Sequence, residues 1–151
     1  MRTHFTFKPF ITALLIAVGL LSATAPAFAL SVPGYAGRVA AGGDQSCALE
    51  SNGAVYSNCI GETYWEIPLA VNPASGLHTV VVSTNNPGGG FFCCTLYAAT
   101  FKGQLITGDE WCPDVNDSVF HLSVNVPANG SMYLYCGLNT GGKVYNVNYS
   151  Q

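Results

Sequence analysis

Apolar side chains recur at every second position along much of this chain, and this alternation constrains its fold more than any other feature. It is clearest over residues 64–71, 119–126, 131–136 and 144–149. Successive side chains of a β-strand point to opposite faces, so a period of two predicts strands with one buried face. After residue 29 no apolar pattern follows the helical spacing for three turns, and we expect no substantial helix there.

Turn-forming residues separate the predicted strands at intervals of about 8 to 12 residues. The segment 77–84 is β-branched in its middle and ends at the Asn, Pro and Gly cluster 85–90. Pro68 cannot donate a hydrogen bond to a neighbouring strand, so we expect it at a sheet edge or bulge. The predicted hairpins are 91–107, turning at Lys102-Gly103, and 119–136, turning at 127–130; a last strand follows with Tyr145, Val147 and Tyr149 on one face.

About seven to nine short strands of this kind favour an all-β fold, an antiparallel β-sandwich reinforced by disulfides. A small β-barrel is the alternative architecture. We use immunoglobulin-like or jelly-roll-like only as descriptions of shape. The immunoglobulin pattern has Tyr two residues before its second Cys, whereas Leu134 precedes Cys136 here.

The first 29 residues have the features of a cleavable export signal. Arg2 and Lys8 precede an apolar run over 10–21, and the segment 25–29 ends in a small-x-small pattern. As a helix the run spans about 18 Å, less than the roughly 30 Å hydrocarbon core, so a membrane anchor is the weaker interpretation. We therefore expect a single secreted domain over 30–151, extracellular or periplasmic, with no transmembrane segment.

The charge of this expected mature chain argues against nucleic-acid binding. The whole chain has a formal charge of −3, and removing Arg2 and Lys8 leaves three basic and eight acidic residues, a charge of −5. Phosphate backbones require a basic surface, which three scattered cations do not supply. The chain is also 12% aromatic and only 9% charged, unlike a disordered protein.

Six cysteines remain after the signal, and an even number in an exported chain predicts disulfides. Adjacent cysteines rarely bond each other, and in a strand they point to opposite faces. We therefore predict that Cys93 and Cys94 are divided between Cys112 and Cys136, and that Cys47 pairs with Cys59. A zinc site is the weaker alternative because the sequence has no CxxC pair.

Residues suited to catalysis are few. His78 and His121 both fall within predicted strands without a flanking nucleophile motif, and we expect His121 on a sheet surface and His78 partly buried. Glu62 and Glu66 flank Tyr64-Trp65 and are the residues that a small secreted hydrolase would use, with the acids of 109–117 as the other choice. That hydrolase is an alternative; we expect no enzymatic activity.

The segment 108–118 is the most acidic part of the chain and is expected to be a solvated loop. Its four carboxylates could supply several of the six to eight oxygens that Ca²⁺ takes. The spacing differs from an EF-hand, so a structural calcium site is the lesser interpretation, and no other cofactor is expected. The candidate calcium ligands are Asp109, Glu110, Asp114 and Asp117.

Aromatic residues provide the candidate binding surface. Several tyrosines fall opposite the apolar stripes, where exposed rings stack on sugars or anchor proteins, although outward tyrosines also pack across strands. We therefore predict a non-catalytic binding module for an extracellular glycan or protein; a self-assembling structural subunit is a further alternative. The candidate ligand-binding residues are Tyr64, Trp65, Tyr133 and Tyr135, with Tyr56 and Phe92 also expected to face outward.

Overall fold

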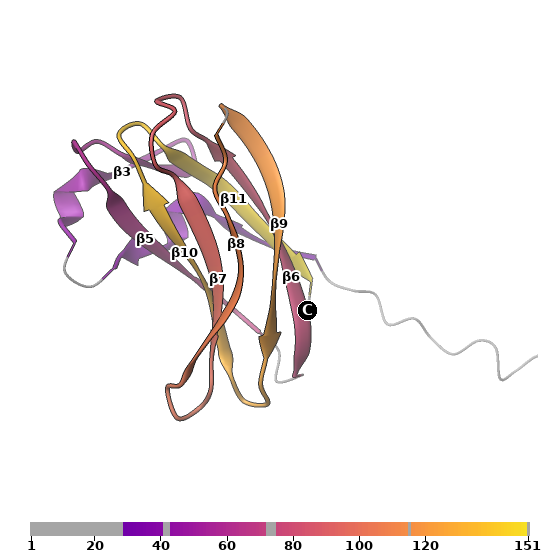
Figure 1. Cartoon of the computed structure of the whole chain (residues 1–151). Coiled ribbons are helices and arrows are strands. Elements are labelled where there is room, and N and C mark those ends of the chain that lie inside the picture. Colours follow the sequence, from indigo (N-terminus) through magenta and orange to yellow (C-terminus); the bar gives the residue numbers. More distant parts are fainter. Residues whose placement is uncertain (1–28, 41–42, 72–74, 115, 151) are drawn as a thin grey trace, which may run out of the picture.

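Two antiparallel sheets lie face to face in the computed structural model, which describes residues 29–40, 43–71, 75–114 and 116–150 (Figure 1). Residues 1–28 of the expected signal lie outside the described residues, so export and cleavage stay predictions. Within the described ranges, no helix is long and apolar enough to cross a membrane.

The six-stranded sheet has the order β3-β4-β11-β6-β9, and β1 also pairs with β11. Every pairing in it is antiparallel. Its strands are β1 (Ala29–Pro33), β3 (Ala48–Ser51), β4 (Ala54–Ser57), β6 (Gly76–Asn85), β9 (Asp117–Val126) and β11 (Lys143–Ser150).

The five-stranded sheet has the order β2-β5-β10-β7-β8 and is also antiparallel throughout. Its strands are β2 (Arg38–Val39), β5 (Thr63–Leu69), β7 (Cys93–Ala99), β8 (Leu105–Trp111) and β10 (Ser131–Leu138). Two short 3₁₀ turns, η1 (Gly34–Ala36) and η2 (Gln45–Cys47), are the only helical elements of the described chain.

The predicted all-β sandwich is confirmed, with two separate sheets rather than one closed sheet. The described residues form eleven strands, more than the seven to nine expected. The additional strands include β2, β3 and β4, which have two to four residues each. A pattern of alternation needs more positions than such short strands offer.

The inner faces of both sheets share one hydrophobic core. Val80, Val82, Phe120 and Leu122 come from the six-stranded sheet and meet Leu134 and other residues of the five-stranded one. The alternation predicted these inward faces over β5, β9 and β10 correctly. Each strand thereby contributes its apolar side to the same interior.

The predicted 91–107 hairpin is confirmed, but the 119–136 hairpin is wrong. β7 pairs with β8 across a turn in which Gly103 has φ +78°. β9 instead pairs with β6, whereas β10 pairs with β5 and β7, so residues 127–130 cross from one sheet to the other. Alternation identifies the buried face of a strand without identifying its neighbour.

The expected edge position of Pro68 is confirmed, whereas the expected inward position of Tyr145 is wrong. β2 pairs only with Trp65 and Glu66, so Pro68 lies in a stretch of β5 that β2 does not reach, as predicted for an edge position. Tyr145 does not share the inward face with Val147: the register shifts between residues 144 and 146, and Tyr145 is exposed. A bulge shifts the alternation by one residue, which reverses which side chain points inward.

The predicted disulfide pattern is confirmed: Cys47 pairs with Cys59, and Cys93 and Cys94 are divided between Cys112 and Cys136. Cys94 and Cys136 face each other across β7 and β10 and are fully buried, whereas Cys93 pairs with Cys112. The third disulfide joins the end of η2 to the segment before β5. The three pairs are Cys47–Cys59, Cys93–Cys112 and Cys94–Cys136.

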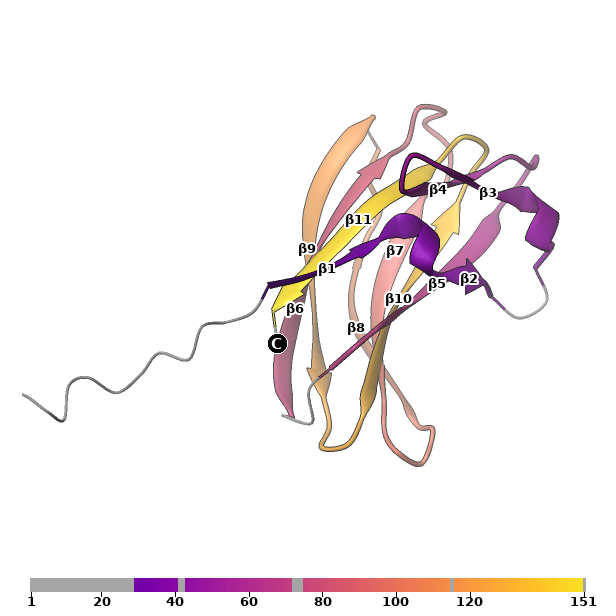
Figure 2. The same cartoon turned by 180° about the vertical axis from the view of Figure 1, so that it is seen from behind.

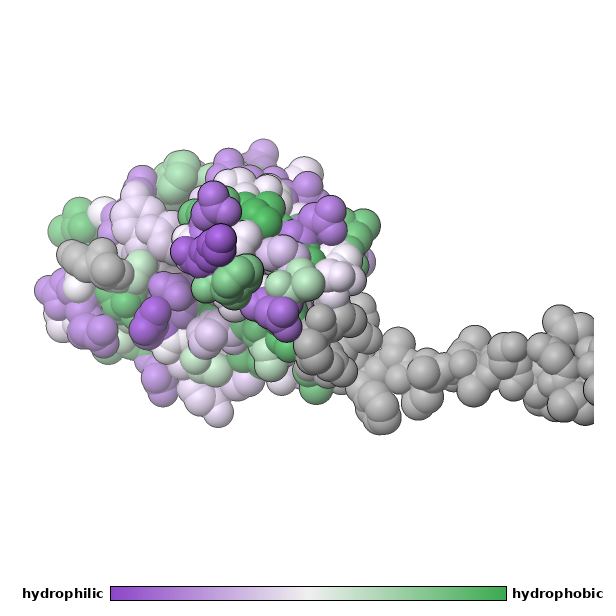
Figure 3. All heavy atoms as spheres, turned by 90° about the horizontal axis from the view of Figure 1, so that it is seen from below, coloured by the Kyte–Doolittle hydropathy of each residue, from purple (hydrophilic) through white to green (hydrophobic). Residues whose placement is uncertain are grey.

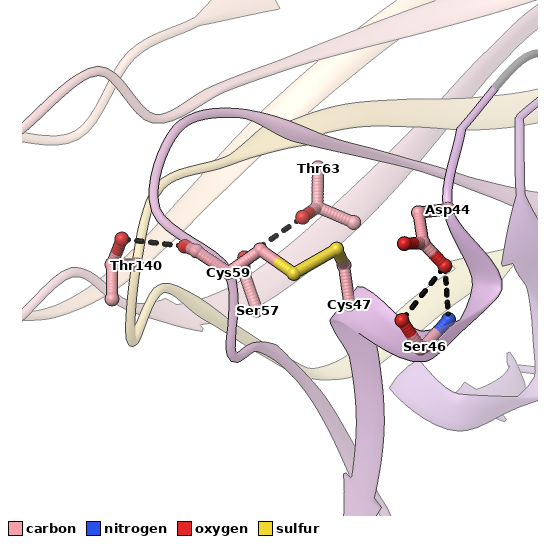
Figure 4. Close-up of a disulfide and its surroundings, with 7 residues drawn as sticks. All are labelled: Asp44, Ser46, Cys47, Ser57, Cys59, Thr63 and Thr140. Carbon is pink, nitrogen blue, oxygen red and sulfur yellow. Dashed lines mark hydrogen bonds between the residues drawn. A yellow bond between two sulfur atoms is a disulfide. The ribbon is translucent and has the colours of Figure 1, made fainter.

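Hydrogen bonds fix the chain around the Cys47–Cys59 disulfide (Figure 4). Ser57 Oγ and Thr63 Oγ1 lie 2.8 Å apart, and Thr140 Oγ1 donates to the Cys59 carbonyl at 2.6 Å. The disulfide and these bonds hold the segment that leads into β5. They therefore position Glu62 and Tyr64 at the start of that strand.

Gly34 is required by a close backbone approach. Trp65 Nε1 donates to the Gly34 carbonyl at 2.9 Å, and a Cβ atom at Gly34 would lie 1.9 Å from the Val144 carbonyl oxygen. We expect Gly34→Ala to lower the free energy of unfolding by about 2 to 4 kcal/mol, because backbone must shift and the indole bond weakens. Urea denaturation measures the effect.

Gly53→Ala is the matched control. A Cβ there meets nothing within 4 Å, although the backbone has φ +83°. It should cost only about 1 kcal/mol, the penalty of a left-handed conformation. Equal losses in the two variants would contradict the steric explanation.

Candidate functional site

The register of the five-stranded sheet gathers four tyrosines on its outer face. Tyr133 of β10 lies opposite Tyr97 of β7, and Tyr135 lies between Thr95 of β7 and Glu66 of β5. Figure 1 shows β5, β10 and β7 side by side. We call Tyr64, Tyr97, Tyr133 and Tyr135 the tyrosine face.

The rings of the tyrosine face form one contiguous array. Tyr64 stacks on Tyr135 with ring centroids 5.5 Å apart, and Tyr97 stacks on Tyr133 at 5.4 Å. Tyr97 and Tyr135 join the two pairs in an edge contact at 6.2 Å. Tyr64 is 39% exposed, so this end of the array offers an aromatic surface to a ligand.

Gly137 leaves room for two rings beside the tyrosine face. It lies opposite Tyr64, and a Cβ atom there would be 3.2 Å from Phe91 Cε1 and 3.3 Å from Tyr64 Cε1. The Phe91 side chain is 55% exposed, so it extends the aromatic surface. The expectation that Phe92 faces outward is wrong, since Phe92 is 1% exposed. Phe91 and Phe92 precede β7, which begins at Cys93, so the alternation of side chains within that strand does not extend to them.

Three carboxylates lie among these rings, each held by a neighbour. Glu62 accepts a hydrogen bond from the Tyr64 hydroxyl, and Glu66 Oε1 lies 3.2 Å from Arg38 Nη2. Thr95 Oγ1 donates to Glu110 Oε2 at 2.8 Å. A carboxylate accepts up to about four hydrogen bonds, so each retains acceptor capacity for a ligand.

Two hollows flank the site along β5. The first, of about 420 Å³, includes the Cys47–Cys59 disulfide in its wall and reaches Glu62 and Tyr64. The second, of about 390 Å³, is lined by Ala36, Gly37, Arg38, Glu66 and Pro68. Both volumes fall within the about 300 to 1,000 Å³ typical of small-molecule sites.

The structure brings together three of the four predicted ligand-binding residues. Tyr64, Tyr133 and Tyr135 share the tyrosine face, but the prediction for Trp65 is wrong, since this residue is 5% exposed and faces the core. Trp65 follows Tyr64 along β5 and therefore points to the opposite side.

Sequence reasoning missed Tyr97 and Phe91 as members of the site. Residues 92–96 are all buried. Four of these five side chains are apolar, so the sequence does not alternate between polar and apolar residues there and does not reveal an outward face. The signal that could have found Tyr97 is its spacing of two from Thr95, which places both on the side opposite Leu96.

The acidic segment is partly strand rather than loop, which corrects the expectation for 108–118. Asp109 and Glu110 lie in β8, and Asp109 Oδ2 accepts from the Ser123 amide at 2.9 Å. Asp117 Oδ1 accepts from Asn85 Nδ2 at 2.9 Å, and Asp114 is exposed. Within the described ranges, no three His, Cys, Asp or Glu side chains are grouped to hold a metal. The calcium site stays a prediction, and a melting temperature unchanged by EGTA would count against it.

The remaining candidate catalytic residues are dispersed. His121 is exposed on β9 and His78 is buried on β6, both in the sheet opposite the tyrosine face. Glu62 and Glu66 lie near the tyrosine face but are bound to Tyr64 and Arg38. The two histidines are thus separated by the core from the two glutamates.

Three hydroxyls of the tyrosine face have raised pKa values. Burial is the main cause for Tyr133 and Tyr135, and the negative charge of Glu66 adds to it in both. The hydrogen bond to Glu62 raises the pKa of Tyr64. All three therefore remain protonated donors beyond the ordinary tyrosine range, which lies near pH 10.

These raised pKa values predict a loss of stability at alkaline pH. The unfolded chain releases its tyrosine protons first as pH rises through about 10, so the folded state loses stability until its own tyrosines ionise. We expect the melting temperature to fall less in this window for a Tyr133→Phe/Tyr135→Phe variant. An unchanged alkaline decline in that variant would exclude these two hydroxyls as its source.

Comparisons with known proteins show which solved structures share this fold. The sequence matches no protein-family model and no curated protein. A C-terminal family 6 carbohydrate-binding module of a Zobellia galactanivorans laminarinase superposes with a TM-score of 0.57 at 12% identity, covering 82% of this chain and 100% of that one.

Two further solved structures give the same result. A family 35 carbohydrate-binding module from Cellvibrio japonicus has a TM-score of 0.52 at 15% identity, with 81% of this chain and 92% of that chain covered. A Cellvibrio mixtus lichenase module in complex with cellotriose has a TM-score of 0.51 at 13% identity, with 81% and 96% covered. The chain therefore has the β-sandwich fold found in carbohydrate-binding modules.

Proposed function

We propose that this protein is a secreted, non-catalytic carbohydrate-binding module whose ligand lies on the tyrosine face. The observation that carries the proposal is the contiguous array of Tyr64, Tyr97, Tyr133 and Tyr135 on one outer face. The fold, shared with modules that bind carbohydrate, supports it. Three disulfides, typical of oxidising compartments, support secretion.

The chemistry of the tyrosine face suits a sugar. The C–H face of a pyranose ring stacks on an aromatic ring, and sugar hydroxyls donate to carboxylates. Glu62, Glu66 and Glu110 provide these acceptors, with Arg38 as the balancing cation. Because this face has three carboxylates and one guanidinium, its net charge is negative, and we infer that the preferred glycan is neutral rather than anionic.

Binding fits this arrangement better than hydrolysis. A glycosidase holds two carboxyl groups across a scissile bond, one as an acid and one as a base or nucleophile. Here Glu62 and Glu66 are two of the three carboxylates beside a row of rings on an open sheet, and each is held by its own partner. We therefore propose that these carboxylates orient a glycan without cleaving it.

A self-assembling subunit would be expected to expose a contiguous apolar patch. At the end of the sandwich that Figure 3 shows, hydrophilic residues are interspersed among hydrophobic ones. That view gives the assembly alternative no support, whereas the ordered rings of the tyrosine face support ligand binding.

A glycan array tests the proposed function. The wild-type chain should bind at least one neutral glycan, and Tyr64→Ala and Tyr133→Ala should each reduce that signal. No glycan signal, or one that neither substitution changes, would refute the proposal and favour a protein partner for this face.

A further inference from the structure

A third hollow lies on the six-stranded sheet, where β1 and β4 pair with different parts of one edge of β11. β1 pairs with residues 146–150, whereas β4 pairs with Lys143 and Val144. Tyr145 falls between the two pairings, at the bulge against β6. Figure 2 shows β1 running along β11 before the chain turns away, with β4 beside the other end of β11.

An open space lies beside Tyr145, lined by residues of β3, β4 and β11 and by Asn52 between β3 and β4. The hollow has a volume of about 450 Å³, and Tyr145 in its wall is 40% exposed. Its lining residues are Ser51, Asn52, Ala54, Tyr56, Lys143 and Tyr145. Two aromatic rings, a hydroxyl, an amide and a cation therefore surround a space of small-ligand size.

Lys143 supplies an uncompensated positive charge in this hollow. Its Nζ lies over the Tyr56 ring, 6.0 Å from the ring centroid. Of the described residues, only Arg38 and Glu66 form an ion pair, so the Lys143 ammonium has no carboxylate within 4.0 Å. In a protein of net charge −3, this is a site at which an anionic group would gain a partner.

We propose that this hollow binds a carboxylated sugar unit, a uronic acid of an acidic saccharide. The carboxylate pairs with Lys143, the sugar ring packs on Tyr145, and hydroxyl groups bond to Ser51 and Asn52. A simple inorganic anion would pair with Lys143 but would not pack against the exposed Tyr145 ring. The site lies on the sheet opposite the tyrosine face and does not depend on the function proposed there.

Calorimetric titration with a short oligogalacturonide tests this proposal. The comparison ligand is its carboxyl-reduced counterpart, in which hydroxymethyl groups replace the carboxylates. We expect the wild-type chain to bind the acidic ligand about tenfold more tightly at low salt. Lys143→Met should remove that preference, Lys143→Arg should retain it, and Tyr145→Ala should weaken both ligands.

Lys102→Met is the matched control, because Lys102 Nζ also lies over an aromatic ring, at 5.6 Å from the Phe101 centroid, but lines no part of this hollow. It should leave the preference unchanged, as should Tyr64→Ala on the other sheet. Equal affinities for the two ligands, no binding, or equal losses in Lys143→Met and Lys102→Met would overturn the proposal. Loss of the preference in Tyr64→Ala would also overturn it, by assigning acidic binding to the tyrosine face.

Discussion

Replacing Tyr64 and Tyr135 together with alanine should weaken neutral-glycan binding by about a hundredfold. Each ring contributes stacking of about 1 to 1.5 kcal/mol, close to tenfold in the dissociation constant. The two rings stack on each other at 5.5 Å, so removing both also exposes the edge of Tyr97. Calorimetry with a glycan identified on the array measures the effect.

Two controls separate ring stacking from other causes. Tyr64→Phe/Tyr135→Phe retains the rings and should lose much less affinity. Tyr35→Ala removes an exposed tyrosine of η1 that lies outside the tyrosine face and should leave binding unchanged. An alanine variant that stays folded by near-ultraviolet circular dichroism and binds normally would exclude stacking on this face.

Removing the buried disulfide with Cys94→Ala/Cys136→Ala should lower the free energy of unfolding by about 4 kcal/mol. The bond closes a loop with a sequence separation of 42. Cross-linking a loop of that length reduces the conformational entropy of the unfolded chain, which stabilises the folded state by about 4 kcal/mol. Both cysteines are fully buried, so their removal also loosens the contact of β7 with β10. The tyrosine face is carried by these same strands.

Cys47→Ala/Cys59→Ala is the matched comparison. The Cys47–Cys59 disulfide has a sequence separation of 12, so its removal should lower the free energy of unfolding by about 3 kcal/mol. This disulfide lies outside the sheet that holds the core disulfide. Guanidinium denaturation of both variants gives the two values. A smaller loss for the Cys94/Cys136 variant than for the Cys47/Cys59 variant would contradict the assignment of the core disulfide as the stronger constraint.

The alternation of side chains along a strand predicted the features of the fold that depend only on residues adjacent in the sequence. Side chains of Cys93 and Cys94 must diverge in a strand, and the structure places them in separate disulfides to Cys112 and Cys136. The inward faces of β5, β9 and β10 followed from alternation for the same reason.

Features that depend on distant pairing were not accessible from the sequence. The turn 127–130 looks like that of a hairpin, yet β9 and β10 belong to different sheets: β9 pairs with β6, and β10 pairs with β5 and β7. Tyr145 faces outward because of a bulge that only the register with β6 reveals. These long-range pairings determine where the hollow beside Lys143 forms.

The candidate site was predicted in part. Alternation placed Tyr133 and Tyr135 outward, but their neighbour Tyr97 comes from a strand whose first residues are buried on both faces. Tyr64 was found and its neighbour Trp65 was wrongly included, because adjacent aromatic residues in a strand point to opposite sides. Knowledge of the β5-β10-β7 order was needed to assemble these residues into one surface.

Nuclear magnetic resonance titration with a neutral glycan tests the central claim most directly, because it locates the ligand on the folded chain. We predict that the largest chemical-shift changes fall in residues 62–66, 91–97 and 133–137, which form and flank the tyrosine face. Changes confined to the six-stranded sheet, or none with any glycan, would contradict the assignment of carbohydrate binding to this face.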